Sequence, residues 1–315
     1  MPNKSVLHNQ CWQEVVQGRL SYQYCELGGY SPPAEDQLAS AAAPTTVIAL
    51  HGWLDNSASF TPMLTHLLQQ PVTPSMQVYA LDFAGHGHSF HRPQGCFYTI
   101  WDYAIDVVQF IKTKNLDKIV LLGHSMGACV APLVASMLPN QIQGICAIEA
   151  LGPVATNIEE TPRQLQKAIL RQAQQQQRQS KVFTSPKAAL AARLGAKMSL
   201  QESAARLLVE RNLAPNAAPE GGFVWRSDRR VTLPSPMRFS EDQVRAVLSN
   251  LKMPVTLIVG DALQTSGELA ERAGLVVQLQ WVRISGDHHL HMENQVSACA
   301  QALVDLCALC LNKEA

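Results

Sequence analysis

The stretch Gly123-His124-Ser125-Met126-Gly127 is the part of the chain from which the fold is best predicted. Residues 118–122 before it, Lys-Ile-Val-Leu-Leu, form a short apolar run typical of a buried strand. Residues 128–138 after it are small and aliphatic and stop at Pro139-Asn140, which indicates a helix and its end. The sequence therefore predicts a strand, a sharp turn and a helix, with a serine at the turn.

A turn this tight explains why glycines flank the serine. It forces Ser125 into a strained backbone conformation, at a cost of about 1–3 kcal/mol. The strand and the helix then pass so close that only small residues fit two positions to either side, where Gly123 and Gly127 stand. The hydroxyl is raised above the sheet, beside free N–H groups at the helix N-terminus that can hold a developing oxyanion. Ser125 is thus a candidate nucleophile.

Strand-like and helix-like segments alternate through most of the chain. Strands are predicted at residues 12–17, 20–24, 45–50, 77–81, 118–122, 144–148, 255–259 and 281–284, and helices at 99–112, 128–138 and 295–311. The alternation predicts an α/β fold with a mostly parallel sheet flanked by helices, in which ligand-binding groups gather at the carboxyl ends of the strands. Polar residues follow six of these strands, namely His51-Gly52, Asp82, Ser125, Glu149, Asp261 and His288.

Residues 153–240 interrupt the alternation. Helical patterns occur there at 165–179, 186–193 and 201–211, with no obvious buried strand. We therefore expect residues 1–152 and 241–315 to form the core domain, and residues 153–240 to form a helical cap, or lid, inserted after the sixth strand.

Composition excludes several other classes of protein. With 25 Lys plus Arg and 25 Asp plus Glu, the 315-residue chain has no net charge, and no long basic run gives it the charge pattern expected of a nucleic-acid-binding protein. The polar N-terminus lacks an apolar signal region, and no stretch of 18 apolar residues predicts a membrane span. Eight scattered cysteines suggest reduced thiols and a cytoplasmic protein. No pattern predicts a metal site, and oligomeric state is left open.

Four motifs appear in the order and spacing of a known superfamily. They are His51-Gly52-Trp53, Asp82-x-x-Gly85-x-Gly87-x-Ser89, Gly123-x-Ser125-x-Gly127 and Gly286-x-His288-x4-Glu293. Together they resemble the α/β-hydrolase superfamily. Within it, Trp225-Arg226-x-Asp228, Leu233-Pro234-Ser235-Pro236 and His288-His289-Leu290-His291 look like the serine hydrolase-like protein family. The resemblance implies an eight-stranded, mostly parallel sheet, a helical cap after the sixth strand, a Ser–His–acid triad and no cofactor.

The triad has a clear nucleophile and base but an open acid. Serine needs a neighbouring base, and His288, which follows the last strand, fits that role better than His289. The usual position of the acid is Leu263, which cannot serve. Two carboxylates remain as alternatives. Glu149 ends the preceding core strand and Asp261 follows Gly260 directly.

The remaining site residues surround the candidate nucleophile. The backbone N–H groups of Met126 and Trp53 are expected to form the oxyanion hole. The candidate substrate-binding residues are His51, Gly52, Phe83 and Trp225, although core packing would explain the aromatic rings equally well.

The expected activity is hydrolysis of a small carboxylic ester or related acyl compound through an acyl-enzyme. Two alternatives stay open: hydrolysis of a carbon–carbon bond next to a ketone by the same triad, and a member of the fold that binds a small ligand without turnover. Labelling of Ser125 by a fluorophosphonate would separate an enzyme from a binding protein.

Overall fold

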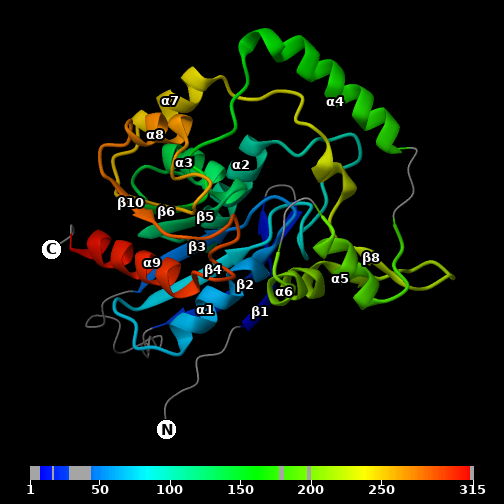
Figure 1. Cartoon of the computed structure of the whole chain (residues 1–315), viewed down its shortest axis with the longest axis horizontal. Coiled ribbons are helices and arrows are strands. Elements are labelled where there is room, and N and C mark those ends of the chain that lie inside the picture. Colours follow the sequence, from blue (N-terminus) through cyan, green and yellow to red (C-terminus); the bar gives the residue numbers. More distant parts are fainter. Residues whose placement is uncertain (1–7, 16–17, 28–43, 177–180, 197–199, 313–315) are drawn as a thin grey trace.

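The computed structural model describes residues 8–15, 18–27, 44–176, 181–196 and 200–312. Its centre is an eight-stranded sheet of order β1-β2-β4-β3-β5-β6-β9-β10 (Figure 1). The strands are β1 His8–Val15, β2 Gly18–Leu27, β3 Thr45–Leu50, β4 Met76–Leu81, β5 Ile119–His124, β6 Ile142–Ile148, β9 Val255–Val259 and β10 Leu279–Arg283. The strands from β4 to β10 in this order run parallel, whereas β2 pairs antiparallel with both of its neighbours, β1 and β4. The predicted mostly parallel α/β sheet is confirmed.

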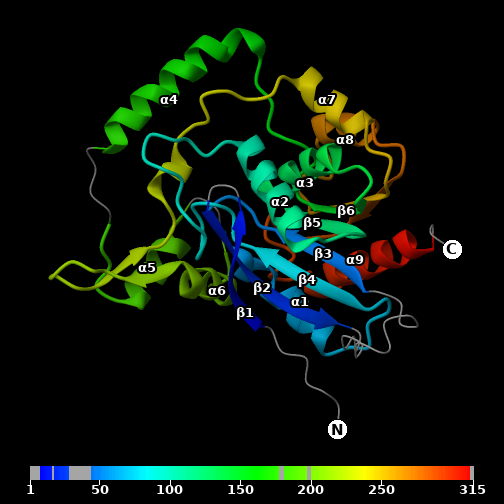
Figure 2. The same ribbon diagram turned by 180° about the vertical axis from the view of Figure 1, so that it is seen from behind.

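Helices cover both faces of the sheet because its central strands are apolar on both sides. On β3, Ile48 and Leu50 belong to one hydrophobic cluster while Val47 and Ala49 belong to the other. The first cluster is closed by α2 Ile100–Lys114, α3 Met126–Met137, α7 Glu241–Ser249 and α8 Gly267–Ala273. The second is closed by α1 Thr61–Leu68 and α9 Val296–Leu311, which lie on the opposite face of the sheet (Figures 1 and 2).

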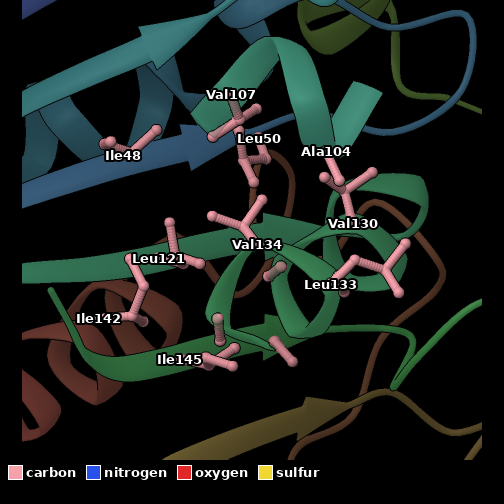
Figure 3. Close-up of a cluster of buried hydrophobic side chains, with 14 of the residues drawn as sticks. Ile48, Leu50, Ala104, Val107, Leu121, Val130, Leu133, Val134, Ile142 and Ile145 are labelled. Carbon is pink, nitrogen blue, oxygen red and sulfur yellow. The ribbon is translucent and has the colours of Figure 1, made fainter. Parts of the chain in front are cut away.

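The packing of α2 and α3 on the sheet fixes the position of the serine turn. Val107 of α2 and Val130 and Val134 of α3 lie against Leu50 and Leu121 of the strands (Figure 3). All of these side chains are at least nine-tenths buried. Because α3 begins immediately after the turn, its burial holds the turn at the carboxyl edge of the sheet.

The edge hairpin differs slightly from its prediction. The strands predicted at 12–17 and 20–24 pair antiparallel as β1 and β2, but Gly18 and Arg19, which lie between the two predicted segments, are the first residues of β2. Val15 pairs with Gly18, so the connection falls at residues 16–17, outside the described residues. Residues Tyr22 to Leu27 of β2 pair with β4, and this pairing extends β2 beyond residue 24, where the predicted strand ends.

The chain between β6 and β9 carries most of the structure outside the sheet layers. It contains η2 Ile158–Glu160, α4 Thr161–Gln176, α5 Pro186–Leu194, α6 Glu202–Asn212, the hairpin β7 Leu213–Pro215 and β8 Phe223–Trp225, and η3 Arg229–Thr232. The predicted helices are present, although residues 177–179 of the first lie outside the described residues. The hairpin was not predicted, because its three-residue strands are too short to show alternation.

This inserted segment has a small core of its own and is tied to the sheet domain. Phe183, Leu190 and Leu208 form a third hydrophobic cluster, separate from those on the sheet. In Figures 1 and 2, α4 lies apart from the sheet, and α5 and α6 lie together near β8. Within the described residues, no helix combines the length and apolar character needed to cross a membrane.

Candidate active site

The turn at Ser125 has the strained geometry that the motif predicts. Ser125 has φ 50° and ψ −109°, a backbone conformation that residues other than glycine rarely adopt. A Cβ atom on Gly127 would lie 1.8 Å from the carbonyl oxygen of Leu50, and one on Gly123 would lie 2.6 Å from the backbone nitrogen of Ala128. Neither position accepts a larger residue, so the two glycines are what allows β5, β3 and α3 to meet at the serine.

Glu149 and His288 form a pair beside this turn. Nδ1 of His288 lies 3.3 Å from Oε2 of Glu149, whose side chain is buried. The other carboxylate oxygen, Oε1, accepts a hydrogen bond of 2.5 Å from the N–H of Gly260. With one oxygen held by backbone and the other facing the ring, Glu149 favours the imidazole tautomer that carries its proton on Nδ1.

Asp261, the other candidate acid, lies elsewhere. Its Oδ2 accepts a 3.0 Å hydrogen bond from the N–H of Gly286, and its own N–H donates to the carbonyl of Gly286 at 3.1 Å. Asp261 is exposed. It therefore fastens the loop that leads to His288, whereas Glu149 contacts the ring itself.

Backbone contacts bring Ser125 to the same corner of the sheet. Its N–H donates to the carbonyl of Ile148 at 2.8 Å, which places it next to Glu149 on the neighbouring strand. His124 contacts the loop from the other side: its Nε2 donates to the carbonyl oxygen of His288 at 2.9 Å, and the two rings lie 4.8 Å apart. The ends of β5 and β6 thus place Ser125 next to Glu149, and the loop after β10 places His288 against Glu149.

The role of His124 was not predicted. Burial and the charges of neighbouring histidines hold its pKa well below the ordinary value, so the ring is neutral. The neutral ring positions the loop of His288 without adding a charge beside it. Its place inside the glycine-flanked motif was the available signal, but only the fold shows what its ring contacts.

A pocket of about 1040 Å³ opens at this corner. Ser125, Met126, Glu149 and Trp53 line its floor together with apolar and aromatic residues from the sheet domain and the inserted segment. The indole Nε1–H of Trp53 donates to the carbonyl of Val231 at 2.9 Å, which joins the floor to the inserted segment. The pocket therefore lies between the strand ends and the insertion.

Both predicted oxyanion donors line this pocket. Met126 is the first residue of α3, so its N–H is not used by the helix's own hydrogen bonds. Trp53 is the second residue of a turn closed by the N–H of Asp55 and the carbonyl of Gly52 at 3.2 Å, a position whose N–H takes no part in the turn. Two residues that line the pocket thus have backbone N–H groups that their own helix and turn leave unused.

The predicted substrate-binding residues have packing roles instead. His51 is fully buried, its Nδ1 donating to the carbonyl of Gly52 at 2.7 Å and its Nε2 accepting from the N–H of Phe83 at 3.0 Å. A Cβ atom on Gly52 would lie 2.8 Å from the His124 ring. Among the described residues that line the pocket, His51, Gly52 and Phe83 are absent.

The two aromatic candidates lie in hydrophobic clusters. Phe83 is fully buried, with its ring 4.9 Å from that of Tyr103. Trp225 packs against Phe183 in the core of the inserted segment, with ring centroids 4.9 Å apart. The pocket wall holds Tyr98, Tyr103 and Phe239 in their place.

A buried carboxylate, Asp55, contacts the loop after β10 that carries His288 and His289. Asp55 lies 3.4 Å from Nε2 of His289 and 3.4 Å from Nη2 of Arg193 on α5. Burial alone would raise the pKa of Asp55, but the interactions with His289 and Arg193 lower it to about 2. His289, the alternative base, is buried and contacts Asp55. His288 is therefore the histidine that contacts Glu149.

A fully buried histidine lies close by. The His291 ring lies 4.1 Å from that of His124, and burial lowers the pKa of His291 to about 3. No group of three or more His, Cys, Asp or Glu side chains in the described part of the chain is arranged to hold a metal ion.

A second ion pair attaches the inserted segment. Arg211 of α6 donates from Nε to both carboxylate oxygens of Asp82, at 3.0 Å each, and from Nη2 at 2.8 Å. Asp82 is fully buried at the end of β4, and Gly87 must be glycine because a Cβ there would lie 2.4 Å from this carboxylate. Asp82 is thus the anchor of the insertion on the strand ends.

Comparison with known proteins shows the family to which the chain belongs. A sequence model described as alpha/beta hydrolase fold matches residues 45–295. The serine hydrolase-like protein of Danio rerio is 30% identical over 261 residues, covering 79% of this chain and 77% of that protein.

Two solved structures show the same architecture. The crystal structure of a hypothetical protein from Pseudomonas aeruginosa PAO1 superposes with a TM-score of 0.79 at 30% identity, covering 98% of this chain and 99% of that one. A thioesterase domain from the curacin biosynthetic pathway shares the fold with a TM-score of 0.73 at 23% identity, covering 95% of this chain and 99% of that one. The chain belongs to the α/β-hydrolase family and, within it, is similar to the serine hydrolase-like proteins.

Proposed function

We propose that this member of a hydrolase family is a serine hydrolase that cleaves a carboxylic ester or related acyl compound through an acyl-enzyme. The observation that carries the proposal is the contact between His288 and Glu149, 3.3 Å apart, beside a strained Ser125 that lines a pocket. A nucleophile, a base and a group that orients the base are what acyl transfer to serine requires.

In the proposed reaction, Oγ of Ser125 attacks the substrate carbonyl carbon while Nε2 of His288 takes the hydroxyl proton. The carboxylate of Glu149 accepts the Nδ1–H and stabilises the resulting imidazolium. The carbonyl oxygen becomes an oxyanion, which the N–H groups of Met126 and Trp53 stabilise.

Collapse of the tetrahedral intermediate breaks the bond to the leaving group, which receives the proton from Nε2. A water molecule, deprotonated by His288, then hydrolyses the acyl-Ser125 ester and restores the free enzyme. No step requires a cofactor.

We further propose that residues 153–240 act as a cap over a core formed by residues 1–152 and 241–315. Glutamines of α4 support this role because they reach loops around the pocket. Gln164 donates to the carbonyl of Ser235 at 2.5 Å and Gln172 to the carbonyl of Gly95 at 3.0 Å. A helix held in this way limits the entry of water and substrate.

The test is labelling with a fluorophosphonate, followed by mass spectrometry of the intact protein and of its peptides. We expect one adduct on Ser125, which is lost in Ser125→Ala. Ser235→Ala is the matched control, since it removes the hydroxyl of another serine that lines the pocket. That variant should label at the wild-type rate.

Turnover of short- and long-chain nitrophenyl esters should follow the same pattern among these variants. A folded wild-type protein that neither labels nor hydrolyses any of these esters would contradict the proposal. It would instead favour a member of the fold that binds its ligand without turnover.

A further inference from the structure

The wall of the pocket is unusually cationic. Four basic residues line it, namely Lys167 and Arg171 on α4, Arg229 on η3, and Arg238. Among the described residues that line the pocket, the one carboxylate is Glu149. That carboxylate is already engaged with His288 and Gly260, so it does not neutralise the wall.

This excess does not reflect the composition of the chain. Lys plus Arg and Asp plus Glu are equal, at 25 each, so positive charge is concentrated on the pocket wall. Lys167 and Arg171 are four residues apart on a helix, which places both on one face. A concave wall of one sign concentrates ligands of the opposite sign.

The ion pairs of neighbouring residues lie elsewhere. On α4, Arg163 pairs with Glu160 at 3.3 Å, and Arg230, next to Arg229, pairs with Asp228 at 2.5 Å. Three of the four basic residues that line the pocket have no such partner. Within the described part of the chain, no carboxylate oxygen lies within 4.0 Å of the cationic atoms of Lys167, Arg171 or Arg238. Their charges are therefore available to a molecule in the pocket.

The floor around the serine is different in character. Trp53 and Tyr103 of the sheet domain line the pocket together with Ser125 and Met126, and their rings suit an uncharged group. The pocket thus combines an apolar floor at the proposed site of attack with a cationic wall formed by the inserted segment.

We infer that the substrate is an ester or thioester with an anionic group, a phosphate or a carboxylate, on the part of the molecule that reaches α4 and Arg238. This inference rests on the proposed function, because it takes Ser125 as the nucleophile. The scissile carbonyl and its uncharged neighbours occupy the floor, and the anion is held by several long basic side chains.

Two matched pairs of substrates separate the possible sources of the charge. The butyryl thioesters of 4′-phosphopantetheine and of pantetheine differ in one phosphate on the leaving group. The nitrophenyl hemiester of succinic acid and nitrophenyl valerate differ in a carboxylate on the acyl group. Preference for the anionic member of either pair supports the inference and identifies the source.

The variant that tests the wall is Lys167→Gln/Arg171→Gln/Arg238→Gln. All three side chains are exposed, so the fold should tolerate the change. We expect kcat/KM for the preferred anionic substrate to fall about 10- to 100-fold, mainly through KM, and to lose most of its salt dependence. Turnover of the neutral partner should stay within about twofold.

The matched control is Arg163→Gln/Arg206→Gln/Arg245→Gln. It removes the same number of charges from exposed ion pairs outside the pocket. Unchanged kinetics in this control show that net charge alone is not responsible.

Equal or better turnover of both neutral substrates by wild-type protein, with normal labelling of Ser125, would overturn the inference and leave the proposed function intact. So would an equal loss in the two triple variants. Absence of labelling in wild-type protein would instead be a failure of the proposed function.

Discussion

Glu149→Gln is the substitution that tests the proposed site most directly. The N–H of Gly260 donates to Oε1 of Glu149, so a glutamine there would keep its carbonyl oxygen toward Gly260. Its NH₂ group would then take the place of Oε2, which lies 3.3 Å from Nδ1 of His288. Since an amide donor requires an acceptor, the ring would carry its proton on Nε2, the nitrogen that must accept the serine proton.

The expected magnitude follows from the same distance. Two unit charges 3.3 Å apart attract by about 5 kcal/mol at an effective dielectric constant of about 20, and this attraction is present only when His288 becomes an imidazolium. Solvent reduces it because the His288 side chain is 31% exposed. A loss of kcat between about 10³- and 10⁴-fold is therefore expected, which agrees with the loss of about 10⁴ when the acid of another Ser–His–Asp enzyme is made an amide.

The assay is kcat on a short nitrophenyl ester, together with the rate of fluorophosphonate labelling. Asp261→Asn is the matched control, since Asp261 is exposed and an asparagine keeps an acceptor for the N–H of Gly286. Its rate should stay within about twofold of wild type. Urea unfolding of both variants separates a catalytic loss from a loss of fold.

The reasoning is refuted if Glu149→Gln, still folded, keeps more than about a tenth of the wild-type kcat. A loss of about 10³-fold in Asp261→Asn instead would identify Asp261 as the acid.

Three further predictions concern stability. Gly127→Ala should lower the free energy of unfolding by more than about 4 kcal/mol or prevent soluble expression, because its Cβ would lie 1.8 Å from the Leu50 carbonyl oxygen. Lowering the pH from 7.5 to 5.5 should reduce the free energy of unfolding by about 3 kcal/mol, measured with urea. Burial lowers the pKa of His86 and His291 to about 3, so both stay neutral in the fold while the unfolded chain takes up protons below about pH 6.5. Arg211→Met should cost about 3–5 kcal/mol and expose the insertion to proteolysis, because it leaves a buried carboxylate at the end of β4 unpaired.

Each of these has a matched comparison. Gly267→Ala, at a glycine with open space around it, should change stability by less than about 0.5 kcal/mol, and an equal loss in both glycine variants would contradict the steric argument. His291→Gln should remove about 1.4 kcal/mol of the loss expected between pH 7.5 and 5.5, which is the share of one histidine that stays neutral in the fold, and an unchanged dependence on pH would show that His291 does not contribute to the loss. Addition of Asp82→Asn to Arg211→Met should recover part of the stability, and a further loss would show that the ion pair is not the cause.

Much of the fold follows from local patterns. Apolar runs such as Thr45–Leu50 predict strands buried on both faces, because each successive side chain must meet a helix layer. The glycine spacing around Ser125 predicts the turn, because close approach of strand and helix is imposed within five consecutive residues. The hairpin of β7 and β8 escaped prediction because three-residue strands are too short to show a period.

The site was predictable as a set of candidates and less so as a set of contacts. Polar residues after parallel strands meet at one edge of a sheet, which is why Ser125, Glu149 and His288 could be selected from the sequence. Phe83 and Trp225 were selected for their aromatic character, which does not distinguish a pocket wall from a core. Lys167 and Arg171 carried a signal in their four-residue spacing, but the helix had first to be placed over the pocket.

The sequence by itself determined the order of strands and helices, the strained serine and the shortlist of two carboxylates, because each depends on residues close together in the chain. Only the tertiary structure decided that Glu149, and not Asp261, contacts His288. That contact depends on the pairing of β6 with β9, which brings the N–H of Gly260 to one oxygen of Glu149 and leaves the other facing the ring. Distances between residues more than a hundred positions apart are set by packing, which no local pattern encodes.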